Sequence, residues 1–337
     1  MIFAVDLGSH EWKGVLLGRR WGRWALKQIQ RVTAPEHTTQ GVAVFRQLWE
    51  TCGQKNPKVV VTLPDRAVLP VVVRLEAGKR FEEDELRRVI QWQARDHWLT
   101  PHDQLVVQWQ SFWGRKGQPS VVVGSLVDRG VLSTYEGFLQ SAGVSRWVID
   151  AAPYRALNSV PDAAFDLVHV GATHTTVWMV EDHRPLAVHR LPVGGAMFTQ
   201  AIGQHRRVSL EHAEKGKRSI AFLPEDWGVP GTEGRLATLE GVMPALKRWT
   251  TFIHDALAAS LRRDSMNTRV PLYLAGGGAG WARLDVALQQ VLGRPVTLWH
   301  PRVMSELTMT DQLLPAGMSW TALSASVGAA WSARKSR

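Results

Sequence analysis

Chemically useful side chains gather near the start of the chain, where two apolar runs meet at a short polar turn. The stretch FAVDLGSHEWKGVLL predicts a strand, a tight turn and a second strand. Backbone N–H groups in such a turn converge on an anion, small residues let a phosphate approach, and a lysine adds positive charge. The carboxylate of Asp6 would hold Mg²⁺ through water, because magnesium keeps several of its waters. The stretch therefore predicts either an ordinary hairpin or a phosphate cradle made of Asp6, Gly8, Ser9, His10 and Lys13.

Two later stretches repeat this small-residue chemistry. GATHTT, with Gly171, Ala172 and Thr175, predicts a turn between two strands. The pair Gly194 and Gly195 opens a predicted helix, whose N-terminus attracts phosphate. Taken singly, each stretch is also compatible with plain turn glycines.

Two further stretches offer contacts for a nucleoside. AEKGK places Glu214 and Lys217 one helical turn apart, either to hold a ribose or base edge or to form a surface ion pair worth a few tenths of a kcal/mol. LAGGGA, with Gly276, Gly277 and Gly278, ends a predicted buried strand, where open backbone can contact a flat adenine. Five such stretches in this order favour a nucleotide site over a set of unrelated turns.

The elements that must position these residues follow an α/β pattern with a repeat. Residues 1–32 alternate as paired strands, 40–52 predict a helix and 58–64 a buried strand. VHVGATHTTVWMV, which begins at Val168, echoes VDLGSHEWKGVLL, and such an internal duplication indicates two similar lobes. The two small-residue turns would then face each other across a cleft.

Between the two halves, residues 71–149 predict the order β-α-β-β-α-β, which would form one compact small subdomain. Its first helix, expected over 81–99, has an acidic first turn, as the helix dipole prefers. Trp92 lies off the main apolar face of this helix, so we expect it to be an exposed partner contact. Further along, 220–234 predict a loop.

Composition limits the class of protein. The chain has 337 residues, of which 45% are hydrophobic and 21% charged, as expected for a soluble globular protein with more than one lobe. No apolar run reaches the roughly 18 residues of a membrane-spanning helix, and the start lacks the pattern of a signal peptide. The single cysteine, Cys52, excludes an intrachain disulfide. We therefore expect a cytoplasmic protein, whose net charge of +10 is scattered and favours an acidic partner or the anionic membrane face over nucleic acid.

These motifs resemble those of the actin-like ATPase superfamily, which includes actin, sugar kinases and the cell-division protein FtsA. DLGS is similar to the first phosphate motif, GATHTT to the second and LAGGGA to the adenosine motif. Within the superfamily the chain most resembles the PilM family of type IV pilus assembly proteins. Stretches spread over nearly the whole chain carry this resemblance: VDLGSHEWKGV, EDELRRVIQWQARDHW, FLQSAGVSRWVIDAAPYRALN, LPVGGAMFTQAI, SLEHAEKGK and LYLAGGGAGWARLDVALQQVLGRPV.

The resemblance implies an α/β, actin-like ATPase fold with two duplicated lobes around a nucleotide cleft and an inserted βαββαβ subdomain of the FtsA and PilM type. It divides the chain as follows: a first lobe at 1–70, the insert at 71–149, the second lobe from 150–204, a subdomain at 205–265, the second lobe continued at 266–320, and a closing helix at 321–337 that returns to the first lobe.

The resemblance also implies a role. PilM-like proteins bind ATP with Mg²⁺ and act as a cytoplasmic scaffold at the inner face of the membrane. They dock the cytoplasmic N-terminal tail of a PilN-like inner-membrane protein in a groove between the first lobe and the insert. Through this partner they connect to the pilus motor ATPases, without binding nucleic acid. The resemblance leaves two questions open: whether the protein forms a homo-oligomer, and whether it serves a pilus or the related machines of type II secretion or competence.

One position departs from the superfamily pattern. The second phosphate motif usually begins with an acid, and here that place is His169. A neutral imidazole is a poor ligand for Mg²⁺, which prefers oxygen, so we expect ATP hydrolysis to be slow or absent while binding persists. Alternatively, His169 ends its strand facing away from the site.

Two other functions fit the same fold. A sugar-kinase-like phosphotransferase needs a catalytic base in the cleft, and Asp150 is the candidate. An FtsA-like filament protein needs a membrane anchor, and the tail at 319–337 is basic at its end but has few large apolar residues.

Overall fold

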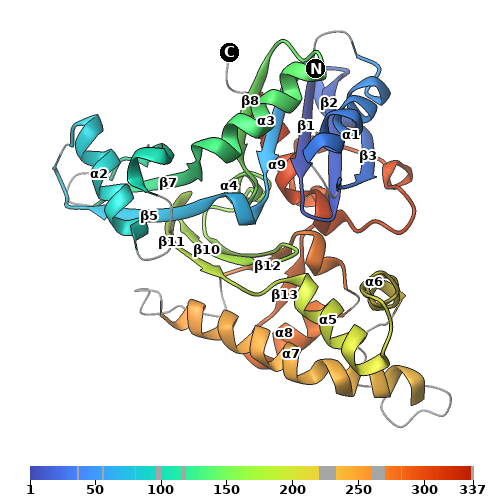
Figure 1. Ribbon diagram of the computed structural model, residues 1–337. Helices are drawn as coiled ribbons and strands as arrows, with labels where there is room; N and C mark the ends of the chain where they lie inside the picture. Colours follow the sequence, from blue (N-terminus) through green and yellow to red (C-terminus); the bar gives the residue numbers. More distant parts are fainter. Residues whose placement is uncertain are drawn as a thin grey trace.

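In the part of the chain that the structure describes, three β-sheets form two lobes and a smaller insert that projects to one side (Figure 1). The computed structural model describes residues 1–35, 38–54, 57–79, 81–95, 101–114, 119–219, 233–259, 270–281 and 283–334. No helix within these ranges is both long enough and apolar enough to cross a membrane.

The first sheet joins its strands in the order β14-β3-β2-β1-β4-β8. Successive residues of β1 point to opposite faces, so Phe3 and Val5 pack under helices α1 and α3 while Ala4 faces α9. The bounds are β1 (Ile2–Leu7), β2 (Glu11–Arg20), β3 (Arg23–Thr33), β4 (Lys58–Leu63), β8 (Trp147–Ala151), β14 (Leu307–Thr308), α1 (Thr38–Thr51), α3 (Arg129–Ser141), α4 (Ala152–Leu157) and α9 (Ser324–Ala333).

The second sheet has the order β11-β10-β9-β12-β13 and repeats the plan of the first. In each lobe the opening strand forms an antiparallel hairpin with the next strand and pairs in parallel with a later one: β1 with β4, and β9 with β12. This confirms the internal duplication. The bounds are β9 (Phe165–Val170), β10 (Thr175–Glu181), β11 (Arg184–Leu191), β12 (Leu272–Ala275), β13 (Val296–Leu298), α5 (Gly195–Arg206), α6 (Leu210–Ser219), α7 (Glu233–Ala258) and α8 (Leu284–Leu292).

The insert is an antiparallel sheet in the order β5-β7-β6, with helix α2 on one face. Leu86 and Ile90 of α2 pack against the buried side chains of this sheet. A capping box between Glu82 and Glu85 fixes the start of the helix. The bounds are β5 (Leu69–Leu75), α2 (Glu83–Ala94), β6 (Leu105–Phe112) and β7 (Ser120–Asp128). The end of the helix expected up to residue 99 lies outside the described residues, as does most of the loop expected at 220–234.

The structure differs from the expected βαββαβ insert in its last strand. The segment expected over 144–150 forms β8, which pairs in parallel with β4 in the first-lobe sheet. Helix α3, which precedes it, packs on α1 of the first lobe. A parallel partner needs a long crossover connection, and the insert itself provides that crossover between β4 and β8. The insert's own sheet therefore ends with β7.

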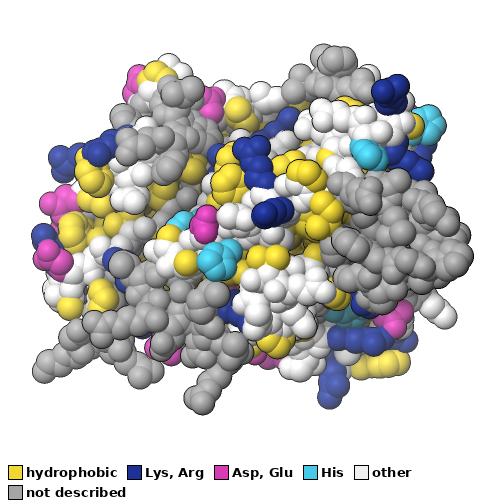
Figure 2. All heavy atoms as spheres, turned by 90° about the horizontal axis from the view of Figure 1, so that it is seen from below, with side chains coloured by type: hydrophobic (Ala, Val, Ile, Leu, Met, Phe, Trp, Pro, Cys, Tyr) yellow, Lys and Arg dark blue, Asp and Glu magenta, His cyan; other side chains and the backbone are white. Residues whose placement is uncertain are grey.

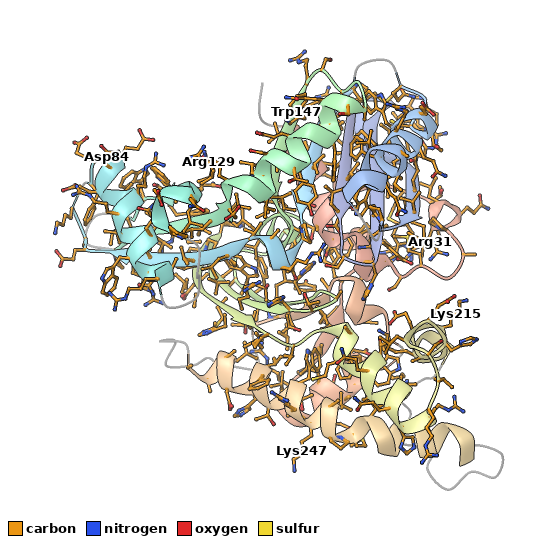
Figure 3. The ribbon with its side chains drawn as sticks, in the orientation of Figure 1. Arg31, Asp84, Arg129, Trp147, Lys215 and Lys247 are labelled. Atoms are coloured by element: carbon orange, nitrogen blue, oxygen red, sulfur yellow. The ribbon has the colours of Figure 1, made fainter. Side chains whose placement is uncertain are left out.

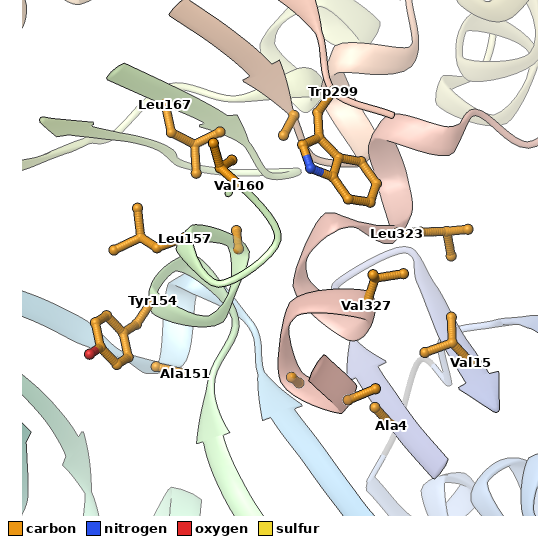
Figure 4. Close-up of a cluster of buried hydrophobic side chains, with 14 of the residues drawn as sticks. Ala4, Val15, Ala151, Tyr154, Leu157, Val160, Leu167, Trp299, Leu323 and Val327 are labelled. Atoms are coloured by element: carbon orange, nitrogen blue, oxygen red, sulfur yellow. The ribbon is translucent and has the colours of Figure 1, made fainter. Parts of the chain in front are cut away.

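A shared hydrophobic cluster lies between the two lobes, built around α4 and α9 (Figure 4). Val15 of the first sheet, Leu167 of the second and Val327 of α9 all belong to it. Most residues of α9 are small because this helix crosses α4 closely. A Cβ atom at Gly328 would lie 1.9 Å from the carbonyl oxygen of Arg155. The closing helix is thus part of the core.

Charge is dispersed on the face of the molecule that is seen from below (Figure 2). Seen from below, Lys and Arg side chains lie at several separate places, with Asp and Glu among them (Figure 2). The net charge of +10 is therefore not gathered into one basic patch on this face.

Candidate functional site

A cavity of about 310 Å³ lies where the two lobes meet. Its walls combine the β1–β2 turn of the first lobe with the β9–β10 turn, the start of α5, helix α6 and the glycine turn after β12. It brings together most of the residues expected at a nucleotide site: Asp6, Gly8, Ser9, His10, Lys13, Gly171, Ala172, Gly195, Glu214, Lys217, Gly277 and Gly278.

Three expected site residues lie behind the cavity wall. Thr175 is fully buried, donates to the carbonyl of Val193 and accepts from the indole of Trp249. Gly276 has a φ of +95°, and a Cβ atom there would lie 2.4 Å from the carbonyl oxygen of Val170. Gly194 precedes α5 and likewise packs on backbone, that of the second turn. These three residues shape the turns and do not line the cavity.

Asp6 and Lys13 form a buried ion pair in the first turn, at 3.0 Å between Oδ2 and Nζ. The hairpin register places the two residues directly opposite each other. Thr62, from the neighbouring strand β4, donates a hydrogen bond of 3.3 Å to the other oxygen of Asp6. A side chain at Gly8 would crowd Lys13, since its Cβ would lie 3.2 Å from Nζ. The turn therefore places a buried ammonium group and a buried carboxylate on the wall of the cavity.

The N-terminus of α5, which was expected to attract phosphate, is bonded to the second turn. The N–H groups of Gly195 and Ala196 donate to the carbonyls of Gly171 and Ala172, at 2.9 and 2.8 Å. These bonds tie the helix to the second turn and occupy two of the donors that a phosphate would need. Gly195 lines the cavity, but its own amide is engaged.

Glu214 and Lys217 form a hydrogen-bonded network on the cavity wall, in which Lys217 is buried and Glu214 is partly exposed. The ammonium group of Lys217 donates to Glu214, to the hydroxyl of Thr199 and to the carbonyl of Gly195, at 2.6, 2.9 and 3.2 Å. By contrast, Lys215 of the same helix is exposed, as Figure 3 shows. The pair at 214 and 217 is therefore not a surface ion pair.

Sequence reasoning missed Asp65, which also lines the cavity. It lies in the stretch TLPDRA directly after β4, and its side chain is 7% exposed. Its Oδ2 atom is 3.5 Å from Nδ1 of His169, and neither atom makes a hydrogen bond within the described part of the chain. An acid just beyond a buried strand was the available signal, because β1 and β4 are parallel and their carboxyl ends meet at one edge.

Arg190 of β11 holds the backbone at Asp65. Its Nε and Nη2 atoms donate to the carbonyl of Asp65 at 3.2 and 3.1 Å. Burial lowers the pKa of the Arg190 guanidinium, and the Asp65 carboxylate opposes this shift. Burial also lowers the pKa of nearby His174, with Arg190 acting in the same direction and Asp65 against it. His169 lines the cavity and lies beside the carboxylate of Asp65. Its side chain therefore does not face away from the site.

The geometry does not favour Asp150 as a catalytic base. Its carboxylate is paired with the guanidinium of Arg155 in α4, with a 2.5 Å hydrogen bond from Nε. Asp150 is not among the residues that line the cavity between the lobes.

A second cavity, of about 510 Å³, opens between the insert and α4 and α9. Gln110 and Phe112 of β6 line it together with Tyr154 and Trp331. The hydroxyl of Tyr154 donates to Gln110, and burial raises the pKa of this tyrosine to about 12. No residue of 1–70 lines this cavity, so it is not the groove between the first lobe and the insert that was expected to hold a partner's tail.

Trp92 is exposed, as expected, with 59% of its surface accessible and Arg95 at 4.0 Å over its ring. It lies on α2, which covers the face of the insert sheet where Leu105 and Val107 point. Gln110 and Phe112 point to the opposite face, because side chains alternate along β6. Trp92 and the second cavity are therefore on opposite faces of the insert.

Comparison with known proteins places this geometry in a family. A family model described as "Type IV pilus assembly protein PilM" matches residues 5–321. A chain of a solved "PilM-PilN type IV pilus biogenesis complex" is similar at 19% identity and a TM-score of 0.77, over 98% of this chain and 97% of that chain. Ethanolamine utilization protein EutJ from Carboxydothermus hydrogenoformans is similar at 12% identity and a TM-score of 0.58, over 98% and 88%. MreB5 of Spiroplasma citri bound to ADP is similar at 10% identity and a TM-score of 0.54, over 97% and 94%.

These structures share the actin-like fold, with two lobes around a cleft, that the order of motifs predicted. Since the family model spans most of the sequence, the chain belongs to the PilM family of type IV pilus assembly proteins.

Proposed function

We propose that this protein binds ATP with Mg²⁺ between its lobes and serves as a cytoplasmic scaffold of type IV pilus assembly, with the tail of a PilN-like inner-membrane protein as its partner. The carrying observation is that small-residue turns from both lobes converge on one cavity, with Lys13 and Lys217 buried in its walls. Two buried ammonium groups beside glycine turns suit a ligand with negative charge.

The lining also suits the parts of ATP. Lys13 and Asp6, which line the cavity as a pair, would contact the phosphates and their cation, and Mg²⁺ commonly takes one or two carboxylates besides phosphate and water oxygens. Elsewhere the cavity is lined by the apolar side chains of Trp281 and Met318 and by the carboxylate of Glu214, which would contact the nucleoside. A bound Mg²⁺ would neutralise phosphate charge; the protein's residues would orient the ligand.

Calorimetric titration of the full chain with MgATP, followed by phosphate release in the same sample, tests this proposal. We expect binding with slow turnover, because residue 169 is an imidazole. AMP lacks the β- and γ-phosphates and should bind at least about tenfold more weakly than ATP if the turns hold those phosphates. Equal affinities for AMP and ATP, or no binding of either, would contradict the proposal.

The second cavity, between the insert and helices α4 and α9, is the proposed site for the partner's tail. Family membership and the similarity to a PilM–PilN complex support this assignment. Through such a partner the chain would lie at the inner face of the cytoplasmic membrane and reach the motor ATPases indirectly. Titration with a peptide of the PilN-like tail should give saturable binding that Phe112→Ala weakens, since Phe112 lines this cavity. Unchanged affinity in that variant would move the partner elsewhere.

A further inference from the structure

We propose that Asp65 supplies the carboxylate that the second phosphate turn lacks, and that it contacts the hydrated divalent cation accompanying the nucleotide phosphates. This inference rests on the proposed nucleotide binding in the cleft and names a further residue for that site.

The first support is an unsatisfied buried carboxylate. Asp65 is 7% exposed, and its Oδ2 atom accepts no hydrogen bond from any described residue. Burying a carboxylate without hydrogen bonds is costly, so natural proteins pair such groups or use them to bind a ligand. Nδ1 of His169 lies 3.5 Å from this oxygen and makes no hydrogen bond to it either. The carboxylate therefore retains capacity to bind something else.

The second support is its place beside the second turn. A Cβ atom at Gly171 would lie 2.5 Å from Oδ2 of Asp65, so only glycine lets this carboxylate approach the turn. Asp65 comes from the short helical turn at Asp65–Ala67 in the first lobe, whereas Gly171 and His169 belong to the second. A carboxylate thus reaches the turn from the facing lobe, next to the position where the imidazole has replaced one.

The third support is the balance of charge in the cavity. Asp6 is neutralised by Lys13, which donates to it at 3.0 Å. Among the described residues no Lys or Arg forms an ion pair with the side chain of Asp65, since Arg190 donates to its backbone carbonyl and acts on the carboxylate only through space. The negative charge of Asp65 is therefore less neutralised by direct ion pairing than that of Asp6, so Asp65 is the better ligand for a cation. Arg190 at the same time anchors the backbone from which that carboxylate projects.

The alternative is a purely structural contact between Asp65 and His169 that joins the lobes. The two roles differ in how nucleotide affinity depends on the cation. A carboxylate that meets a hydrated cation strengthens binding when the cation is present and repels the bare phosphates when it is absent. A structural contact changes both affinities in the same direction.

The experiment is calorimetric titration of the full chain with ATP, either with Mg²⁺ or with EDTA at matched ionic strength. Wild type should bind more tightly with Mg²⁺. In Asp65→Asn, an isosteric neutral variant, the ratio of the two dissociation constants should shrink about tenfold, and binding in EDTA should be unchanged or tighter. Asp311→Asn removes the same charge from an exposed ion pair with Arg302 and should leave the ratio at the wild-type value.

The outcomes separate the two proposals. If wild type binds ATP and Asp65→Asn keeps the full dependence on Mg²⁺, the role of Asp65 is refuted while nucleotide binding stands. That role is also refuted if both affinities fall equally in Asp65→Asn or if wild-type binding ignores Mg²⁺. If wild type does not bind ATP under any of these conditions, the proposed nucleotide binding fails, and this inference with it.

Discussion

The Oδ2 atom of Asp65 lies 3.5 Å from Nδ1 of His169, so a side chain of the first lobe meets the end of strand β9 in the second. Both side chains are at most 8% exposed, and both line the cavity between the lobes. The contact pairs the residue that departs from the superfamily pattern with a carboxylate from outside any recognised motif.

Restoring an acid at position 169 should destabilise the protein. His169→Asp would place a second buried carboxylate against Asp65, and two such groups resist being ionised together. We expect the free energy of unfolding at pH 7.5 to fall by about 3 kcal/mol, as for other unpaired buried charges. Urea denaturation of the full chain measures this.

The double variant His169→Asp with Asp65→Asn separates charge from shape. It keeps one carboxylate at the contact and should recover most of the lost stability. His169→Asn serves as a neutral control of similar size to aspartate. If His169→Asp is no less stable than His169→Asn, the two side chains do not interact as the structure indicates.

Lys13 should matter for nucleotide binding and for stability through different contacts. Lys13→Met removes the positive charge beside the first turn, so ATP affinity should fall at least about tenfold. It also leaves the buried carboxylate of Asp6 without its cation, at a cost of about 3 kcal/mol in unfolding free energy. Calorimetry with MgATP and urea denaturation measure the two effects.

Adding Asp6→Asn to Lys13→Met removes the unpaired charge. Stability should then return toward the wild-type value, whereas ATP affinity should stay low. Recovery of ATP affinity in the double variant would show that Lys13 acts only by neutralising Asp6.

Trp92 is predicted to contact the partner. This contact requires the PilN-like tail to extend beyond the second cavity onto the α2 face of the insert. Trp92→Ala should then weaken binding of the tail peptide by about tenfold, because exposed tryptophans often dominate interfaces. The melting temperature should change little, since the ring is 59% exposed. Fluorescence anisotropy with a labelled peptide and a thermal melt test both points.

Trp21 offers a matched control. It is 89% exposed and has Arg20 at 4.4 Å over its ring, as Trp92 has Arg95. Trp21→Ala should leave peptide affinity unchanged. If Trp92→Ala also leaves it unchanged, Trp92 is removed from the partner surface; a clear drop in melting temperature would instead assign Trp92 to the fold.

Stability should decrease as the pH falls from 7.5 to 5.5. Burial lowers the pKa of both His174 and His189 below the ordinary value near 6.5. The unfolded chain therefore binds protons more readily in this range, and the stability that these residues contribute above pH 6.5 is lost as the pH falls through their folded pKa values. Nε2 of His189 is buried and makes no hydrogen bond to a described residue, which fits a neutral ring.

Urea denaturation across this range, in wild type and His189→Gln, measures the effect. The variant should show a shallower dependence of unfolding free energy on pH. Val188→Ala, one residue earlier on the same strand, should lower stability at every pH and keep the wild-type slope. An unchanged slope in His189→Gln would contradict the assignment.

The sequence by itself determined the local parts of the site. Alternating apolar residues around DLGS predicted the first hairpin, and the register then places Asp6 opposite Lys13. The repeat at GATHTT predicted a second hairpin of the same kind, and the two sheets share their strand order. Such features follow from side-chain period and turn chemistry within about twenty residues, so they can be recognised without tertiary contacts.

Tertiary structure decided what depends on distant pairing. Asp65 and His169 lie close together although they are 104 positions apart in the sequence, and no local pattern links them. The assignment of β8 to the first sheet depends on a parallel edge offered by β4, whereas order along the chain suggested the insert. The burial of Lys217 arises because α5 and α6 pack together around Thr199. The sequence determines which chemical groups the protein has. The packing of the two lobes determines which of these groups lie in the cleft, because burial and charge pairing act between neighbours in space.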